Sequence, residues 1–115
     1  IEIDRIKKAI DRSDRFRQRV YTEREIAYCE SKRIGSYQSY AGIYAAKEAF
    51  LKALGTGLRY GSWQDIEVSH DEFGAPVLII TGAFKTIMQE RMYTESIVSI
   101  SHCQSYAMST VIIKG

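Results

Sequence analysis

Residues 45–57 read AAKEAFLKALGTG, and this stretch carries the strongest helix signal in the chain. Alanine, leucine, lysine and glutamate have high helix propensity, and we predict a helix from about Ser39 to Leu54 that is rich in these residues. Gly55 is expected to end it, because glycine readily adopts the left-handed conformation found at many helix ends. We therefore predict a long central helix against which the rest of the chain packs.

Three side chains of this helix, Tyr44, Glu48 and Lys52, are spaced by four residues and so lie on one face. Helix geometry alone favours an ordinary surface ion pair between Glu48 and Lys52, worth a few tenths of a kcal/mol. However, Lys47, Glu48 and Lys52 are embedded in an otherwise apolar run, where charged groups need partners. This context makes the same face a candidate binding or catalytic site.

The residues before the central helix are predicted to form short helices. Isoleucines recur at helical spacing near the start of the chain, with Asp4 as the candidate cap. Thr22 and Glu25 have the spacing of a capping box and predict a helix that runs to about Lys32. Residues 34–39 are then predicted to be a loop.

The residues after the central helix favour strands. Alternating apolar and polar residues, separated by turn residues, predict antiparallel strands and one short helix. The strands are expected at residues 66–69, 77–80, 96–101 and 106–113, and the helix at 82–92. Helices followed by a strand-rich half indicate an α+β fold with an antiparallel sheet, and we interpret residues 1–115 as a single domain.

Basic residues are concentrated at the start of the chain, since ten of the sixteen lysines and arginines lie in the first 33 positions. Between Arg5 and Arg19 there are seven basic and two acidic residues. Such a run is typical either of a solvated helix face or of a docking surface for an acidic partner. That partner could be a nucleic acid or an acidic protein.

Other motifs restrict the function less strongly. His102 lies in the predicted turn between the last two strands, where a solvent-facing turn histidine is the ordinary interpretation. The chain has no nucleotide-binding glycine fingerprint, no P-loop and no G-x-S-x-G nucleophile elbow. No apolar run approaches the roughly 18 residues of a membrane span, so we expect a cytoplasmic protein that does not bind membranes.

The stretch 45–57 closely resembles the signature helix of bacterial acyl-carrier-protein synthases, of the 4′-phosphopantetheinyl transferase superfamily. The likeness continues in order through residues 2–6, 63–68, 74–76, 99–102 and 106–107. It implies transfer of 4′-phosphopantetheine from coenzyme A to a serine of apo acyl carrier protein, in fatty acid and lipid biosynthesis. It also implies a magnesium cofactor, release of 3′,5′-ADP, and a homotrimer whose active sites lie at subunit interfaces.

Carried over residue by residue, the resemblance implies that Glu48 is a catalytic magnesium ligand. Lys47, Lys52, Gly55 and His102 would lie near coenzyme A, with Lys52 also catalytic. The carrier protein would be bound by basic residues of the first helices, namely Arg5, Arg12, Arg15 and Arg19. A water on the metal or on Glu48 could accept the serine proton, so the general base remains open.

The sequence departs from the family pattern at several positions. The second magnesium carboxylate of the family would fall before residue 1, and Asp4 is out of register with it. Either a first strand that carries this carboxylate lies upstream of Ile1, which we favour, or this protein has lost the ligand. Ile43 replaces a usual arginine. The other departures remove a hydroxyl and two lysines from expected coenzyme A contacts, at Cys103, Gln104 and Ala75.

Two alternatives to an active transferase remain at this stage. The departures are compatible with a coenzyme A binding homologue of weakened activity. The basic run on its own is compatible with a nucleic-acid-binding module, which would need exposed aromatic side chains among its arginines. Phe16 is the one aromatic residue in that run, and its helical spacing favours a place in the core. We therefore predict a transferase with no nucleic-acid partner.

Overall fold

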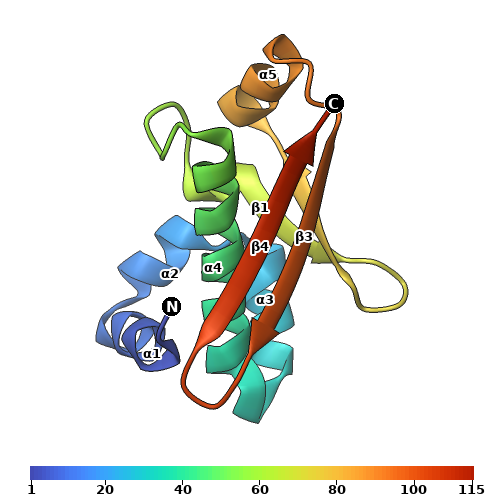
Figure 1. The fold of residues 1–115 in the computed structure, drawn as a ribbon. Helices are drawn as coiled ribbons and strands as arrows, with labels where there is room; N and C mark the ends of the chain where they lie inside the picture. The colour runs from blue at the N-terminus through green and yellow to red at the C-terminus, as the bar shows by residue number, and fades with distance from the viewer.

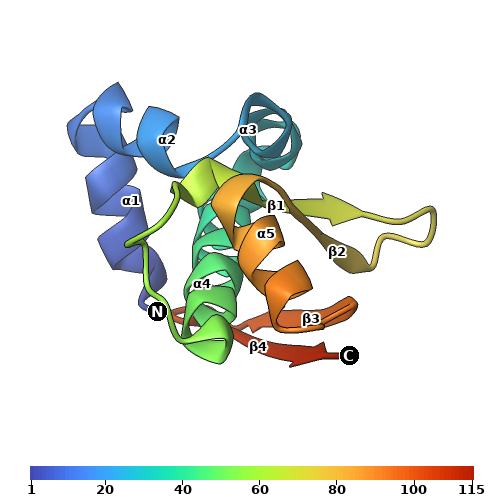
Figure 2. The same cartoon turned by 90° about the horizontal axis from the view of Figure 1, so that it is seen from above.

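The long helix α4 (Ser36–Leu54) lies at the centre of the fold, in a computed structural model that covers residues 1–115. Figure 2 shows the other helices and both strand pairs arranged around it. Buried residues recur every three to four positions along α4, and they pack against the several elements that surround the helix. They are Tyr40, Ala41, Gly42, Ile43, Ala46, Lys47, Phe50, Leu51 and Leu54. None of the helices has both the length and the apolar character needed to cross a membrane.

Three short helices precede α4, namely α1 (Ile3–Arg12), α2 (Asp14–Val20) and α3 (Glu23–Ser31). The capping box is confirmed, because the Thr22 hydroxyl accepts from the Glu25 backbone and the Glu25 carboxylate accepts from the Thr22 backbone. The prediction that Asp4 caps α1 is wrong. Glu2 occupies the N-cap position, and Asp4 instead pairs with Lys8 at 3.0 Å on the exposed face.

The predicted loop at residues 34–39 is largely helical. A single 3₁₀ turn, η1 (Arg33–Gly35), leads directly into α4 at Ser36. One cause is a contact distant in sequence: the Tyr37 hydroxyl donates to Asp11 Oδ1 at 2.6 Å and ties the first turn of α4 to α1. Gly55 ends α4 with a φ of 83°, as predicted.

The strands form two separate antiparallel pairs. β1 (Ile66–His70) pairs with β2 (Pro76–Ile80), and β3 (Glu95–His102) pairs with β4 (Ala107–Lys114). The 3₁₀ turn η2 (Trp63–Asp65) precedes β1, and α5 (Gly82–Glu90) connects the two pairs. In Figure 1 the β3–β4 hairpin runs along α4, while the turn of the β1–β2 hairpin extends away from the body.

Helix α4 approaches the β3–β4 hairpin closely at Gly42. A Cβ atom at this position would lie 2.8 Å from the Ile100 side chain, so a larger residue would push β3 away. At the other end of the chain, Ile1 and Ala107 exchange backbone hydrogen bonds of 2.8 and 2.9 Å. This pairing brings Ile1 beside β4 and α4. The strand expected upstream of Ile1 stays a prediction.

Candidate active site

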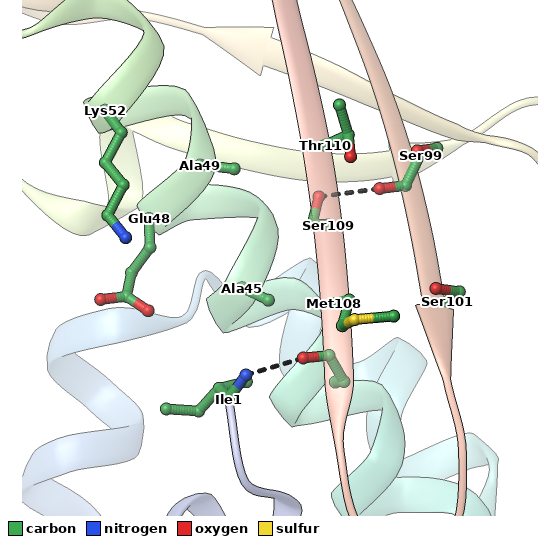
Figure 3. Close-up of a pocket in the computed structure, with 11 residues that line it drawn as sticks. Ile1, Ala45, Glu48, Ala49, Lys52, Ser99, Ser101, Met108, Ser109 and Thr110 are labelled. Carbon is green, nitrogen blue, oxygen red and sulfur yellow. Dashed lines mark hydrogen bonds between the residues drawn. The ribbon is translucent and has the colours of Figure 1, made fainter.

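Glu48 and Lys52 lie one turn apart on α4, as their spacing predicts. Both line a pocket of about 440 Å³ between α4 and the β3–β4 hairpin, which we call the α4–β4 pocket. Figure 3 shows Ala45 and Ala49 turned toward the strands, with Glu48 and Lys52 on the adjacent side of the helix. The ion pairs of the chain join other side chains, so the surface pair between Glu48 and Lys52 does not form. Both charges remain available to a ligand.

A second pocket of about 470 Å³ adjoins the same two charges on the other side. Gly55, which sequence resemblance placed near coenzyme A, lines it together with Glu48 and Lys52. Trp63 forms part of its wall, and we call it the Trp63 pocket. Glu48 and Lys52 thus lie on a ridge shared by two pockets, where they can meet a ligand that extends into both.

Tyr44 connects this ridge to the basic surface of α1 and α2. Burial raises the pKa of the Tyr44 hydroxyl, the charge of Glu48 raises it further, and the charges of Arg5 and Arg19 oppose both effects. The Tyr44 ring also lies 5.1 Å from the Trp63 ring, centroid to centroid. Two of the predicted carrier-binding arginines are therefore near the predicted catalytic helix face.

All four predicted carrier-binding residues, Arg5, Arg12, Arg15 and Arg19, are exposed on α1 and α2. Phe16 packs against the core, with its ring centroid 6.1 Å from that of Tyr44. The aromatic side chain that a nucleic-acid-binding surface would need is therefore not presented among these arginines. The structure leaves the patch as a charged, non-aromatic surface.

The interpretation of Lys47 as a phosphate contact is wrong. Its side chain is fully buried, and its ammonium donates to Val20 O at 2.6 Å, Glu25 Oε1 at 2.7 Å and Trp63 O at 3.1 Å. An ammonium group has three donors, so none remains for a phosphate. Burial lowers the pKa of Lys47 and raises the pKa of Glu25, while the charge of each opposes the shift of the other.

His102 lies apart from Glu48 and Lys52. At the end of β3 it lines a smaller pocket of about 170 Å³ with Gly74, Pro76 and Ile43, which we call the His102 pocket. No residue lines both this pocket and either pocket of the ridge. The residues that resemble coenzyme A contacts of the family therefore fall into two groups within one chain.

Several lining residues were missed from the sequence. Ser99 and Ser101 line the α4–β4 pocket, and their spacing of two along a strand was a usable signal. Tyr28 and His70 line the His102 pocket with rings stacked 3.9 Å apart. They come from α3 and β1, and nothing local in the sequence indicates that they meet.

Glu48 is compatible with a magnesium ion in this site. It is the one carboxylate that lines the α4–β4 pocket and the Trp63 pocket, and no group of three potential metal-binding side chains occurs in the chain. Magnesium typically takes one or two protein carboxylates and completes its shell with water and substrate phosphates. A half-buried carboxylate without an ion-pair partner suits that role.

Comparison with known proteins places the chain in a class. Residues 1–111 match the family model described as the 4′-phosphopantetheinyl transferase superfamily. The chain belongs to this superfamily and is one of its enzymes. It is 44% identical over 115 residues to a holo-[acyl-carrier-protein] synthase of Thermoanaerobacter sp. (strain X514), covering all of this chain and 83% of that one.

Further relatives narrow the class. A holo-[acyl-carrier-protein] synthase of Moorella thermoacetica is 41% identical over 116 residues, covering all of this chain and 89% of that one. Both relatives match all of this chain, and both are holo-[acyl-carrier-protein] synthases. The chain is therefore an enzyme of the holo-[acyl-carrier-protein] synthase type.

Solved structures confirm the predicted α+β fold. The Helicobacter pylori synthase in complex with coenzyme A has a TM-score of 0.86 at 31% identity, covering 99% of this chain and 95% of that one. The Bacillus anthracis synthase in complex with CoA (3′,5′-ADP) has a TM-score of 0.79 at 35% identity, covering 98% and 89%.

Proposed function

We propose that this enzyme transfers 4′-phosphopantetheine from coenzyme A to a serine of an apo acyl carrier protein, with magnesium as cofactor. The serine oxygen forms a bond to the phosphorus that carries the pantetheine arm, and the bond between that phosphorus and the bridging oxygen breaks. The products are the holo carrier protein, used in fatty acid synthesis, and 3′,5′-ADP. The serine proton would pass to a water held by Glu48, or to one that a bound magnesium ion would supply.

The observation that carries this proposal is the ridge of Glu48 and Lys52 between two pockets. A pyrophosphate lies between the nucleotide and the arm of coenzyme A, so its binding site needs charge at the centre and room on both sides. Phosphoryl transfer depends mainly on positioning and on neutralising the phosphate oxygens. Glu48 and Lys52, the two opposite charges of the ridge, have no protein ion-pair partner. They can therefore both position the phosphates and neutralise the charge of the phosphate oxygens.

We assign Lys52 to the phosphate oxygens and Glu48 to a magnesium ion. When bound, the cation would neutralise charge that develops on the bridging oxygen. The exposed Lys52 ammonium can follow the phosphates because it sits on a flexible stem. Ser99 and Ser101 supply hydroxyl groups on the opposite wall, where they can orient polar parts of a substrate.

We further propose a homotrimer in which one subunit supplies the ridge and its neighbour supplies the His102 pocket. The separation of His102 from Glu48 within one chain favours this arrangement. A closed ring of three chains would repeat one heterologous interface three times and create three equivalent sites. Exposed apolar side chains on the β3–β4 hairpin, Ile97 and Ile112, are available for such an interface.

The proposed reaction predicts a specific mass change. Incubation with apo acyl carrier protein, coenzyme A and magnesium should add one phosphopantetheine group to the carrier serine, and mass spectrometry would detect it. Omission of magnesium should remove the product. A carrier variant with serine replaced by alanine is the matched control. An unmodified carrier, together with measurable binding of coenzyme A, would instead favour a coenzyme A binding homologue of weakened activity. The uncharged Ile43 in the His102 pocket, at a position where the family usually has arginine, is compatible with that alternative.

The basic residues of α1 and α2 are proposed to bind an acidic surface of the carrier protein. These residues are exposed, and Arg5 and Arg19 lie near Tyr44. A carrier protein bound to them would therefore lie close to the ridge. Complementary charge mainly accelerates association and makes it salt-dependent. The proposed partner is therefore a protein with an acidic surface near its modified serine.

Arg5→Glu is expected to raise the KM for the carrier protein about tenfold and to leave the KM for coenzyme A within about twofold. The reason is that charge reversal repels an acidic partner, whereas the ridge residues are unchanged. Steady-state kinetics at low and moderate salt would measure both constants. Arg59→Glu, at an exposed arginine outside α1 and α2, is the control. Equal effects of Arg5→Glu on both substrates would contradict the assignment.

A further inference from the structure

Lys47 is the one charged residue of the central helix that the proposed reaction does not use, although it directly precedes Glu48. Its ammonium and the Glu25 carboxylate are both fully buried and 2.7 Å apart. A buried charge pair is weak evidence for stability, because desolvation of the two groups offsets much of their attraction. The arrangement therefore calls for an explanation beyond stability.

The hydrogen-bond partners of the pair lie on several elements that surround α4. Lys47 donates to Val20 O at the end of α2 and to Trp63 O in η2. Glu25 accepts from the backbone N–H of Val68 in β1 at 2.7 Å and from that of Thr22 at 2.9 Å. The pair thus connects α4 to four segments through backbone groups whose positions do not depend on side-chain rotamers.

Trp63 links this network to the site. Lys47 donates to its backbone carbonyl at 3.1 Å, and Trp63 lines the Trp63 pocket together with Glu48 and Lys52. Consecutive helix residues point about 100° apart. Because Lys47 is tethered inward, Glu48 leaves α4 about 100° further around the helix, toward the two pockets that it lines.

We propose that Lys47, paired with Glu25, is a positioning residue that fixes Trp63 and the orientation of Glu48 for the transfer reaction. The proposal rests on the proposed function for its kinetic part only. Its structural part concerns Trp63, which is the one tryptophan of the chain and can be followed by its fluorescence without any substrate.

The test uses Lys47→Met, which keeps most of the side-chain volume and removes all three donors. The expected result is a red-shifted Trp63 emission with greater acrylamide quenching, and a kcat about tenfold lower, measured well below the melting temperature. Met88→Ala is the control, because this core truncation on α5 contributes no acceptor to Lys47. It should lower the melting temperature while leaving Trp63 emission and kcat near wild type.

A second variant covers the case in which Lys47→Met does not fold. Lys47→Met combined with Glu25→Gln leaves no unpaired buried charge and should fold, yet it lacks the tether to Trp63. Emission and quenching of Trp63 identical to wild type in a folded variant would overturn the proposal, as would an equal loss of kcat in Met88→Ala. If wild type itself transferred nothing, the proposed function would fail, and the emission data would still decide whether Lys47 positions Trp63.

Discussion

Glu48→Gln is expected to lower the transfer rate by at least about 100-fold while the protein remains folded. The substitution keeps the shape and the helix propensity of the side chain, so the free energy of unfolding should change by less than about 1 kcal/mol. Its effect falls on charge. A neutral amide binds magnesium far less well than a carboxylate, and Lys52 then remains as the principal charge on the ridge.

The measurement is modification of the carrier protein by mass spectrometry across a magnesium titration, together with a thermal melting curve. Because Glu48 is the one carboxylate lining the ridge pockets of this chain, higher magnesium should recover only part of the rate. Glu90→Gln, at an exposed glutamate on α5, is the matched control and should behave like wild type. Near-normal turnover by a folded Glu48→Gln enzyme would refute the assignment of Glu48.

Chains carrying Glu48→Gln and chains carrying His102→Ala, each nearly inactive alone, are expected to regain activity when co-expressed. In the proposed trimer a site takes Glu48 from one subunit and His102 from its neighbour, so mixed assemblies contain some sites with both native residues. Random assembly at equal amounts should restore about one quarter of wild-type activity per site. Light scattering on the same sample should give a particle of three chains.

The matched control replaces His102→Ala with Lys52→Met. Glu48 and Lys52 line the same pockets of one chain, so a mixture of Glu48→Gln and Lys52→Met chains contains no site with both native residues. It should stay inactive. Recovery in both mixtures, recovery in neither, or a monomeric particle would each contradict sites shared between subunits in the proposed way.

Local sequence patterns were sufficient for most elements of the fold. The capping box at Thr22 and Glu25 and the helix end at Gly55 were predicted correctly, because each depends on backbone groups within a few residues. Asp4 was assigned wrongly, because α1 begins directly after Glu2, where the chain start pairs with Ser105 and Tyr106, about 100 residues later. The start of α4 was also missed, because Tyr37 is held by Asp11, 26 residues earlier.

The sequence by itself determined the helix that carries the site and the shared face of Glu48 and Lys52, because a spacing of four residues places two side chains on one helix face. Only the tertiary structure decided which neighbouring charge is buried. Lys47 and Glu48 are adjacent, yet the partner of Lys47 lies 22 residues away on α3. Likewise, only the packing of the hairpins placed His102 in a separate pocket. Contacts between distant segments depend on how whole elements pack, and no local period encodes them.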